Sequence, residues 1–325
     1  RHVAPVVRGN CRETHRAPIM VDIVKTAHIP VMMDEVMEYL APRPGQVIVD
    51  ATAGLAGHSE AIMARIGESG TLVAIDRDET SLAQARQRLE GLPGTKHFMH
   101  GNFSDLDTFL KELHIEQIDG ILFDLGVSSY QLLDPERGFS FQEEGPLDMR
   151  LDRESYISAY DLINNLNEDE ISQLLWSFGQ ERWHNRIAHR LVQERERHPI
   201  ATTTELREIV MQSIPMRFRR HHYRIHPATR TFQAVRIAVN RELEVLESAL
   251  SKAIGLLKPG GRICVISFHS LEDRIVKLAF RKASAEGALN LITRKPLVPG
   301  QEEMERNPSS RSSKFRAAER SRETV

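Results

Sequence analysis

Cysteine is nearly absent from this chain, which has two cysteines among its 325 residues, Cys11 and Cys264. They lie far apart, and neither has further Cys or His residues around it at the spacing of a zinc site. The sequence therefore indicates neither a disulfide framework nor a metal centre. Such sparse cysteine is typical of proteins in a reducing compartment, so we expect a cytoplasmic protein.

Long apolar runs and an excess of one charge are missing as well. No stretch approaches the roughly 18 to 20 apolar residues that a membrane helix needs, so no membrane span is predicted. The 43 Lys and Arg nearly balance the 45 Asp and Glu. Any site for a polyanion must therefore be local. The 41% of hydrophobic residues can fill the core of one large domain or two medium ones.

The N-terminal segment begins with Arg and carries four arginines and one glutamate in residues 1–19, without apolar periodicity. We expect Met20 to be the native start and residues 1–27 to be a flexible extension. An organelle-targeting segment is the alternative, because such segments are rich in Arg and poor in acidic residues.

From residue 46 onward, short apolar runs alternate with helical patterns. This alternation is typical of βαβ units with a parallel sheet. The predicted strands are 46–53, 71–76, 96–100, 118–125, 262–268 and a closing strand at 313–318, and the helices between the first four are 59–66, 80–89 and 106–113.

A long helical stretch interrupts this alternation after Gly126. It predicts helices at 168–178, 186–195 and 204–213, with Thr202, Thr203 or Thr204 as a cap, and then one helix from Thr231 to Leu257 before a Pro-Gly-Gly turn. The economical description is an α/β fold, a Rossmann-like sheet with an inserted helical domain. We assign 28–135 and 226–325 to the sheet domain and 136–225 to the insert.

The loop between the first strand and the first helix is a candidate nucleotide site. The strand ends at Asp50, and small residues then let a ligand approach the start of a helix. A second acid, Asp76, ends the next strand, where a carboxylate can bind ribose hydroxyls. NAD would need three glycines to admit its pyrophosphate, whereas this loop has Gly54 and Gly57 with Ala56 between them. The pattern therefore favours S-adenosylmethionine.

Seven motifs in order resemble the RsmH family, also called MraW. They are His28–Met32, Asp50–Ser59, Asp119–Ser129, Arg137–Phe141, Gly145–Arg150, His226–Ile237 and Ser267–Arg274. The resemblance covers residue 28 to the C-terminus. It implies a class I methyltransferase sheet and an enzyme that transfers a methyl group from S-adenosylmethionine to the exocyclic N4 of a cytidine in the decoding centre of 16S rRNA, within the small ribosomal subunit.

The resemblance also implies which residues hold the donor: Ala56, Gly57, His58, Asp76, Phe103, Asp124 and Gln131. Two positions depart from the family, which commonly has Gly where Ala56 stands and Arg where Ser309 stands. Ala56 is tolerable if its φ stays negative. Ser309 removes one phosphate contact.

Two residues are candidates for the chemistry of transfer. Asp124 ends the fourth strand and is expected to accept a hydrogen bond from N4, to hold the donor, or both. His269 follows the fifth strand at the same edge of the sheet and could line the cytosine pocket. The alternative for His269 and Ser270 is a capping role, because acidic residues fill the first turn of the helix that follows.

Arginine is concentrated where the RNA should bind. Residues 181–230 hold eleven arginines against five glutamates, and residues 306–322 hold five arginines and a lysine against one glutamate. Arginines with interleaved aromatics suit phosphate pairing and base stacking, although a solvated surface is the plainer interpretation. The predicted RNA-binding residues are Arg217, Arg219, Arg220, Tyr223, Arg224, Arg230, Arg311 and Lys314.

Several alternatives stay open at this point. The chain could methylate another substrate or mitochondrial small-subunit rRNA, or it could be a non-catalytic RNA-binding assembly factor. A homodimer is also open.

Overall fold

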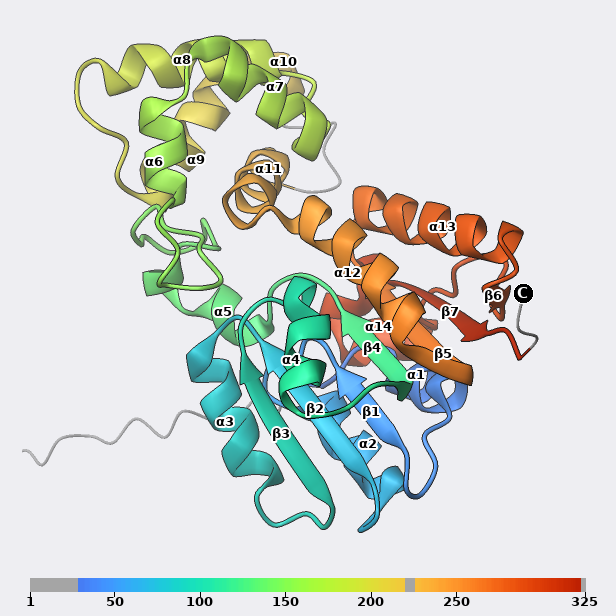
Figure 1. Ribbon diagram of the computed structural model, residues 1–325. Helices are drawn as coiled ribbons and strands as arrows, with labels where there is room; N and C mark the ends of the chain where they lie inside the picture. The colour runs from blue at the N-terminus through green and yellow to red at the C-terminus, as the bar shows by residue number, and fades with distance from the viewer. Residues whose placement is uncertain (1–28, 220–225, 323–325) are drawn as a thin grey trace, which may run out of the picture.

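A central sheet has the strand order β3-β2-β1-β4-β5-β7-β6 (Figure 1). The computed structural model describes residues 29–219 and 226–322. The strands β1 to β5 run parallel, and β7 is antiparallel to both β5 and β6. Their bounds are β1 Val47–Asp50, β2 Thr71–Asp76, β3 Thr95–His100, β4 Ile118–Asp124, β5 Leu257–Ser267, β6 Leu289–Leu291 and β7 Lys314–Arg320.

Both faces of the sheet are buried because neighbouring residues of each strand enter different cores. Ile48 and Leu122 pack on the face covered by α1 (Met33–Leu40), α2 (Gly57–Ile66) and α3 (Glu79–Leu89). Val49 and Phe123 pack on the face covered by α4 (Leu106–Glu112), α12 (Glu242–Leu256) and α13 (Ser270–Ala285). The predicted α/β fold with a Rossmann-like sheet is therefore confirmed.

The helices of the interruption pack around a third core, beside the sheet domain (Figure 1). This core runs from Phe139 to Val235. It therefore takes in α11, which lies beyond the predicted boundary at residue 225. The helices are α6 Ala159–Asn165, α7 Glu168–Gly179, α8 His184–Arg195, α9 Thr203–Ser213, α10 Met216–Arg219 and α11 Thr229–Asn240. Of the three threonines offered as caps, Thr202 is the one that caps α9.

Shorter elements complete the described chain. They are α5 Ser129–Leu133, α14 Gln301–Arg306 and the 3-10 turns η1 Phe103–Asp105, η2 Pro135–Arg137 and η3 Pro308–Ser312. None of the helices in the described ranges has the length and apolar character to cross a bilayer.

Two predictions along the chain are wrong. The single helix expected from Thr231 to Leu257 is broken into α11 and α12 at Arg241, whose φ of 50° lies in the left-handed region. The turn expected at Pro259–Gly261 is instead the irregular start of β5, where the register with β4 shifts between Ile118 and Gly120. Apolar periodicity continues across the helix break, which is why the sequence pattern does not reveal it.

Candidate active site

A cavity of about 320 Å³ opens at the carboxyl ends of the parallel strands. This is the edge at which open α/β sheets bind their ligands. Six of the eight residues predicted for the donor or the chemistry line it: Gly57, His58, Asp76, Phe103, Asp124 and Gln131. Ala56 and His269 are not among the lining residues.

Hydrogen bonds donated by its own backbone N–H groups fix the conformation of the loop after β1. Gly54 N donates to the Asp76 carboxylate at 2.7 Å, and Thr52 N donates to Asp50 at 3.2 Å. Ser59 Oγ also donates to Asp50, at 2.7 Å. A side chain at Gly57 would collide with the ring of Pro30, so this position requires glycine. The loop therefore presents backbone, with little side-chain bulk, to the cavity.

Ala56 has the geometry that the sequence did not expect. Its φ is 61° and its ψ is 28°, so an alanine occupies the left-handed region that favours glycine. It stands immediately before α2, and its methyl group is fully buried in the core between the sheet and α1 and α2. Ala56 thus shapes the donor loop from behind and leaves contact with a ligand to its neighbours.

Acidic and aromatic residues lie on the β2 and β3 side of the cavity. Each oxygen of Asp76 accepts one backbone N–H, from Gly54 and from Asp78, and each keeps a lone pair for a further donor such as a ribose hydroxyl. Burial raises the pKa of Asp76. Phe103 packs edge-on against Phe123, with ring centroids 5.5 Å apart. Asp76 and Phe103, the residues predicted to contact the adenosine, thus both line the cavity.

Gln131 lines the cavity, but hydrogen bonds within the protein already engage its amide. Its Oε1 accepts the backbone N–H of Ser128 at 3.0 Å in a capping box at the start of α5. Its Nε2 donates to Asp78 at 2.9 Å. We infer that Gln131 fixes the wall of the cavity.

Asp124 lines the cavity, and one oxygen of its carboxyl is buried. Oδ1 has no hydrogen-bond partner among the described residues. Oδ2 lies 3.6 Å from Nδ1 of His58, whose Nε2 is 3.0 Å from the carbonyl oxygen of Val31. Burial, and then the charges of Asp50 and Glu272, raise the pKa of Asp124 to about 8. An unpartnered buried carboxyl of this kind is completed by a cation or a hydrogen-bond donor.

A charged wall faces the cavity from α11, α12 and α13. Arg236 donates to both oxygens of Glu242, at 2.8 and 2.9 Å, and both side chains are largely buried. Glu272, 3% exposed, accepts the backbone N–H groups of Phe268 at 2.8 Å and His269 at 3.3 Å. Burial opposes ionisation of Glu272, but His269 and Arg236 hold its pKa below the ordinary value.

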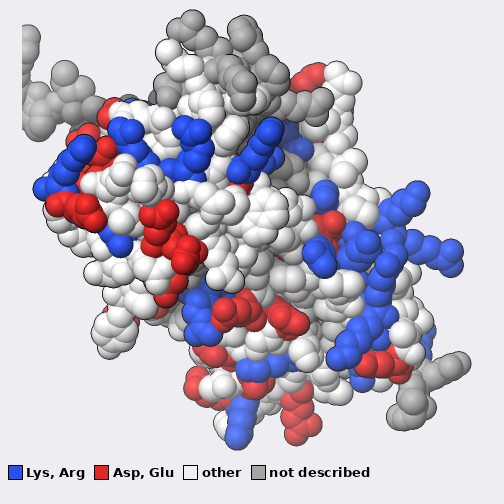
Figure 2. All heavy atoms as spheres, turned by 90° about the horizontal axis from the view of Figure 1, so that it is seen from above, with Lys and Arg blue, Asp and Glu red and all other residues white. Residues whose placement is uncertain are grey.

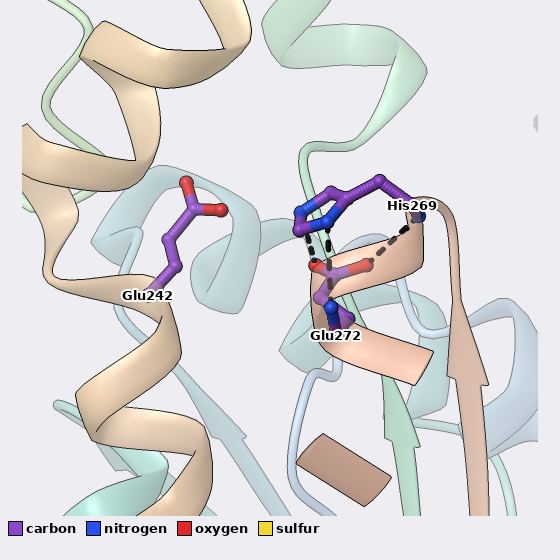
Figure 3. Close-up of side chains that lie close together, drawn as sticks. All are labelled: Glu242, His269 and Glu272. Carbon is purple, nitrogen blue, oxygen red and sulfur yellow. Dashed lines mark hydrogen bonds and ion pairs between the residues drawn. The ribbon is translucent and has the colours of Figure 1, made fainter. Parts of the chain in front are cut away.

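The structure places His269 elsewhere than predicted. Its ring caps α13: Glu272 N donates to Nδ1 at 3.4 Å, and Nε2 lies 3.2 Å from Glu272 Oε1. Figure 3 shows the imidazole folded back over Glu272, with Glu242 approaching from α12. The capping alternative therefore describes His269, and the cap is His269 itself, with Ser270 as the first residue of the helix.

Glu242, His269 and Glu272 are also a group whose ligand atoms lie close enough to hold a metal ion. Their interactions argue against that use. Arg236 already neutralises Glu242 through two hydrogen bonds. A ring whose Nδ1 accepts a hydrogen bond carries its proton on Nε2, the atom that faces Glu272.

Sequence reasoning missed Arg236, Glu242 and Glu272 as residues that line the cavity. Arg236 and Glu272 stand inside two of the motifs that carry the family resemblance, so a signal for them was present. Glu242 stands outside every motif, and only the break at Arg241 brings it beside Arg236.

A buried ion pair joins the donor side of the cavity to the inserted helices. Asp78, directly after β2, pairs with Arg137, and both side chains are 4% exposed. The Nη2 of Arg137 then donates to the carbonyl oxygens of Arg150 and Leu151, at 3.1 and 2.9 Å. Leu151 N donates in turn to Asn240 Oδ1 at 2.8 Å. These hydrogen bonds thus connect the loop after β2 with the start of the insert and the end of α11.

The predicted RNA-binding residues fall into three groups. Arg220, Tyr223 and Arg224 lie outside the described residues. Arg217 and Arg219 lie in α10, where only the backbone is described. Arg230 is exposed and donates to the carbonyl oxygen of Gln180, Arg311 is exposed, and Lys314 lies 3.5 Å from Asp273.

Some arginines of the insert serve its own structure. Arg186, Arg195 and Arg207 donate to the carbonyl oxygens of Ser213, Ile163 and Phe141, respectively. Their charges are therefore tied to the packing of the insert. Basic side chains also gather on the right of Figure 2, on the side of α13 and β6, and α13 exposes Arg274, Arg281 and Lys282.

The residues of the cavity fit S-adenosylmethionine. The orphaned oxygen of Asp124 suits a cationic ligand, Asp76 keeps acceptor capacity for ribose, and Phe103 offers an aromatic surface. The two-glycine loop at Gly54 and Gly57 presents the backbone that such a donor needs.

Comparison with known proteins agrees with this geometry. The profile of the MraW methylase family matches residues 25–321. The chain is 49% identical over 308 residues to ribosomal RNA small subunit methyltransferase H of Trichlorobacter lovleyi, across 90% of this chain and 98% of that protein. The protein of the same name from Brevibacillus brevis is 44% identical, with the same coverage.

Among solved structures, a putative rRNA-methylase from Clostridium thermocellum aligns with 89% of this chain, and the alignment covers 94% of that structure's chain. The sequence identity is 14% and the TM-score is 0.44. The family match and the two relatives decide the assignment. The chain is an S-adenosylmethionine-dependent methyltransferase and belongs to the MraW methylase family.

Proposed function

We propose that this enzyme methylates the exocyclic N4 of a cytidine in the decoding centre of 16S rRNA. The observation that carries the proposal is the near-complete match to relatives named for the small-subunit RNA, together with a donor cavity that retains the residues expected for it. The proposal treats the assembled small ribosomal subunit as the natural partner.

For methyl transfer to N4, the main task of the protein is to position the donor and the base. The N4 lone pair of cytosine is delocalised into the ring, so N4 is a weak nucleophile. S-adenosylmethionine supplies an activated methyl group on a sulfonium. The protein's residues must hold nitrogen, methyl carbon and sulfur in line and keep water out, and alignment of this kind can account for several kcal/mol of the barrier.

Asp124 is the residue that we propose acts closest to the transfer. Its carboxyl is neutral below pH 8 in the empty cavity, because its pKa is raised to about 8. A cationic ligand beside Oδ1 would favour the charged form. The ionised carboxylate can then hold the donor and accept a hydrogen bond from N4 as the nitrogen loses its proton.

Access to the base requires a second surface. A nucleotide in folded RNA must leave its stack, which costs a few kcal/mol, so contacts elsewhere have to offset that cost. We propose that the inserted helices, predicted at 136–225, and the basic tail make those contacts. Arg230, in α11 just beyond this range, and Arg311, in the tail, are both exposed.

The test of the activity is transfer of a labelled methyl group to small subunits from cells that lack the enzyme. Digestion and mass analysis of the RNA should then show N4-methylcytidine at a single position. Another methylated nucleoside, or label in protein, would overturn the proposal.

The test of the RNA surface is replacement of Arg219 and Arg220 together by glutamine. Binding to small subunits should weaken, and the slope of log K against log salt should fall by roughly one to two. The affinity for the donor should not change. Arg65→Gln, at an exposed arginine in the last turn of α2, is the control. An unchanged slope would contradict the assignment.

A further inference from the structure

We define the charged wall of the cavity as Arg236, Glu242 and Glu272. Hydrogen bonds fix the positions of these side chains more closely than packing alone requires. On a continuous helix, residues six apart point in different directions. The left-handed residue Arg241 breaks the helix between Arg236 and Glu242, which lets Glu242 take both hydrogen bonds from the guanidinium. Asn240 Nδ2 then donates to the carbonyl oxygen of Arg236 at 2.9 Å and fixes the end of α11.

The hydrogen bonds leave a defined face of each group unused. Arg236 spends Nε and Nη2 on Glu242, and no hydrogen bond of its Nη1 is found within the described part of the chain. Glu272 is fixed by two backbone N–H groups and by the His269 ring, and it also lines the cavity. The wall thus offers a guanidinium donor and carboxylate acceptors, all with their rotamers set by neighbours.

The charges of the wall do not balance. One guanidinium faces two carboxylates, and Arg236 and Glu242 already satisfy each other. Glu272 adds a negative charge that raises the pKa of Asp124 nearby. The backbone N–H groups of Phe268 and His269 and the His269 ring stabilise this carboxylate, which also lines the cavity. A ligand that donates hydrogen bonds to the carboxylate side and accepts one on the guanidinium side would complete the wall.

A base with an exocyclic amine beside a ring acceptor has this pattern. Cytosine presents N4–H groups, and then the N3 and O2 acceptors, along one edge. Uracil presents an acceptor where cytosine has its amine, and this acceptor would face a carboxylate. A buried hydrogen-bonding site rejects a mismatched analogue strongly because its own groups would be left unpaired.

We propose that the charged wall reads the Watson–Crick edge of the acceptor cytosine, with Glu272 accepting from N4 and Arg236, held by Glu242, donating to the ring acceptors. This inference rests on the proposed function and adds to it the residues that select the base. Glu272 and Arg236 are then specificity-determining residues, and His269 and Asn240 are positioning residues that act through them.

The experiment compares the conservative variants Arg236→Lys and Glu272→Gln with wild type. Lysine keeps the charge and loses the planar fork, while the glutamine amide can donate to a uracil O4. Each variant should lose roughly 10- to 100-fold in kcat/KM on small subunits, as expected for loss of one specific base contact. The Kd of Arg236→Lys for S-adenosylmethionine should stay within about threefold, and melting curves of both variants should show the native fold. Glu272→Gln is assayed at saturating donor, because Glu272 also raises the pKa of Asp124.

The second measurement is discrimination between cytidine and uridine, which would not change if the wall had only a structural role. Small subunits that carry uridine at the mapped position compete with cytidine-bearing subunits for the enzyme. They should compete poorly against wild type and at least about fivefold better against Glu272→Gln. The matched control is Arg65→Lys, because Arg65 is exposed in the last turn of α2 and has no part in the wall.

The result that overturns the inference is unchanged activity and unchanged discrimination in both variants while wild type still makes N4-methylcytidine. In that case the proposed function stands and the wall does not read the base. If wild type makes a different product, the proposed function itself fails, and the identity of that product shows it independently of any variant.

Discussion

Ala56 shows how two small effects at one residue can cancel. An alanine in the left-handed region is strained by roughly 1 to 2 kcal/mol, but its buried methyl group contributes about 0.8 kcal/mol. Glycine would lose that methyl and add freedom to the unfolded chain, at a further cost of roughly 0.4 to 1 kcal/mol. The opposing contributions are similar in size, so alanine can stand where glycine is common.

We therefore expect Ala56→Gly to change the free energy of unfolding by less than about 1 kcal/mol, because the opposing contributions above nearly cancel. Ala56→Val should lower it by more than about 2 kcal/mol, because a branched side chain fits neither the positive φ of 61° nor the filled core. Urea unfolding of both variants measures this. Strong stabilisation by glycine would mean that the methyl group contributes nothing.

Asp124 should make donor binding dependent on pH. Because its pKa in the empty cavity is about 8, the carboxyl holds a proton at neutral pH and releases it when a cation binds. The affinity for S-adenosylmethionine should rise as the pH increases from 6.5 to 8.5, and the dependence should disappear in Asp124→Asn. His58, Asp50 and Glu272 surround this carboxyl and are unchanged in that variant.

The same raised pKa has a consequence for stability, with a definite sign. Between the unfolded value near 4 and the folded value of about 8, the native state keeps a proton that the unfolded chain has lost. This contribution to stability is complete below the unfolded pKa and is lost as the pH rises through 8.

If Asp124→Asn binds the donor and methylates RNA at the normal rate, the proposed role of Asp124 is wrong.

At the scale of the element, α13 shows how the sequence can place a residue in the fold without giving the direction of its side chain. The position of His269 after β5 placed it at the right edge of the sheet. Spacing cannot tell a ring that enters a cavity from one that folds back onto its own helix. That choice depends on Glu272, which lies three residues on and accepts from Phe268 and His269.

The variants His269→Asn and His269→Ala separate the two roles. Asparagine can cap the helix as histidine does, so the unfolding free energy should stay within about 0.5 kcal/mol, while alanine should lose roughly 1 kcal/mol. Methyl transfer by His269→Asn should fall by less than about tenfold. A proton-transfer residue would lose 100-fold or more, and a loss of that size would restore a catalytic role.

The break between α11 and α12 is a second case at this scale. Strands and most helices followed from apolar periodicity, because burial repeats every two or 3.6 residues. The left-handed turn at Arg241 leaves no mark on that period. The partner of Arg236 therefore could not be found from the sequence, although Arg236 itself lay within a motif.

At the scale of the whole molecule, the pair Asp78–Arg137 links donor binding to the insert. Arg137 does not line the cavity, yet it holds Asp78, whose backbone N–H donates to Asp76. We expect Arg137→Gln to weaken the affinity for S-adenosylmethionine about tenfold and to lower the melting temperature, because a buried partner is left unpaired. Calorimetry and thermal melting measure both effects.

The matched control is Arg150→Gln. The Arg150 guanidinium forms two hydrogen bonds with Asp148, but that pair lies within the start of the insert, and among the described residues neither side chain bonds to the β2 loop. Its loss should leave donor affinity within about twofold. Equal effects of the two substitutions would mean that the insert as a whole, and not this pair, supports the donor site.

The sheet topology also bears on how the enzyme is made. The strand β7, close to the C-terminus, lies between β5 and β6, and Ser309 and Ser312 just before it complete the donor cavity. Asn307 and Glu303 fasten the same segment to Ile29 and Met32 at the other end of the described chain. During translation, a nascent chain therefore cannot assemble its donor cavity until the segment around residues 303–312 has left the exit tunnel. A truncated product that stops before residue 303 would lack these hydrogen bonds and the part of the cavity wall that Ser309 and Ser312 form, so we expect it to bind the donor weakly.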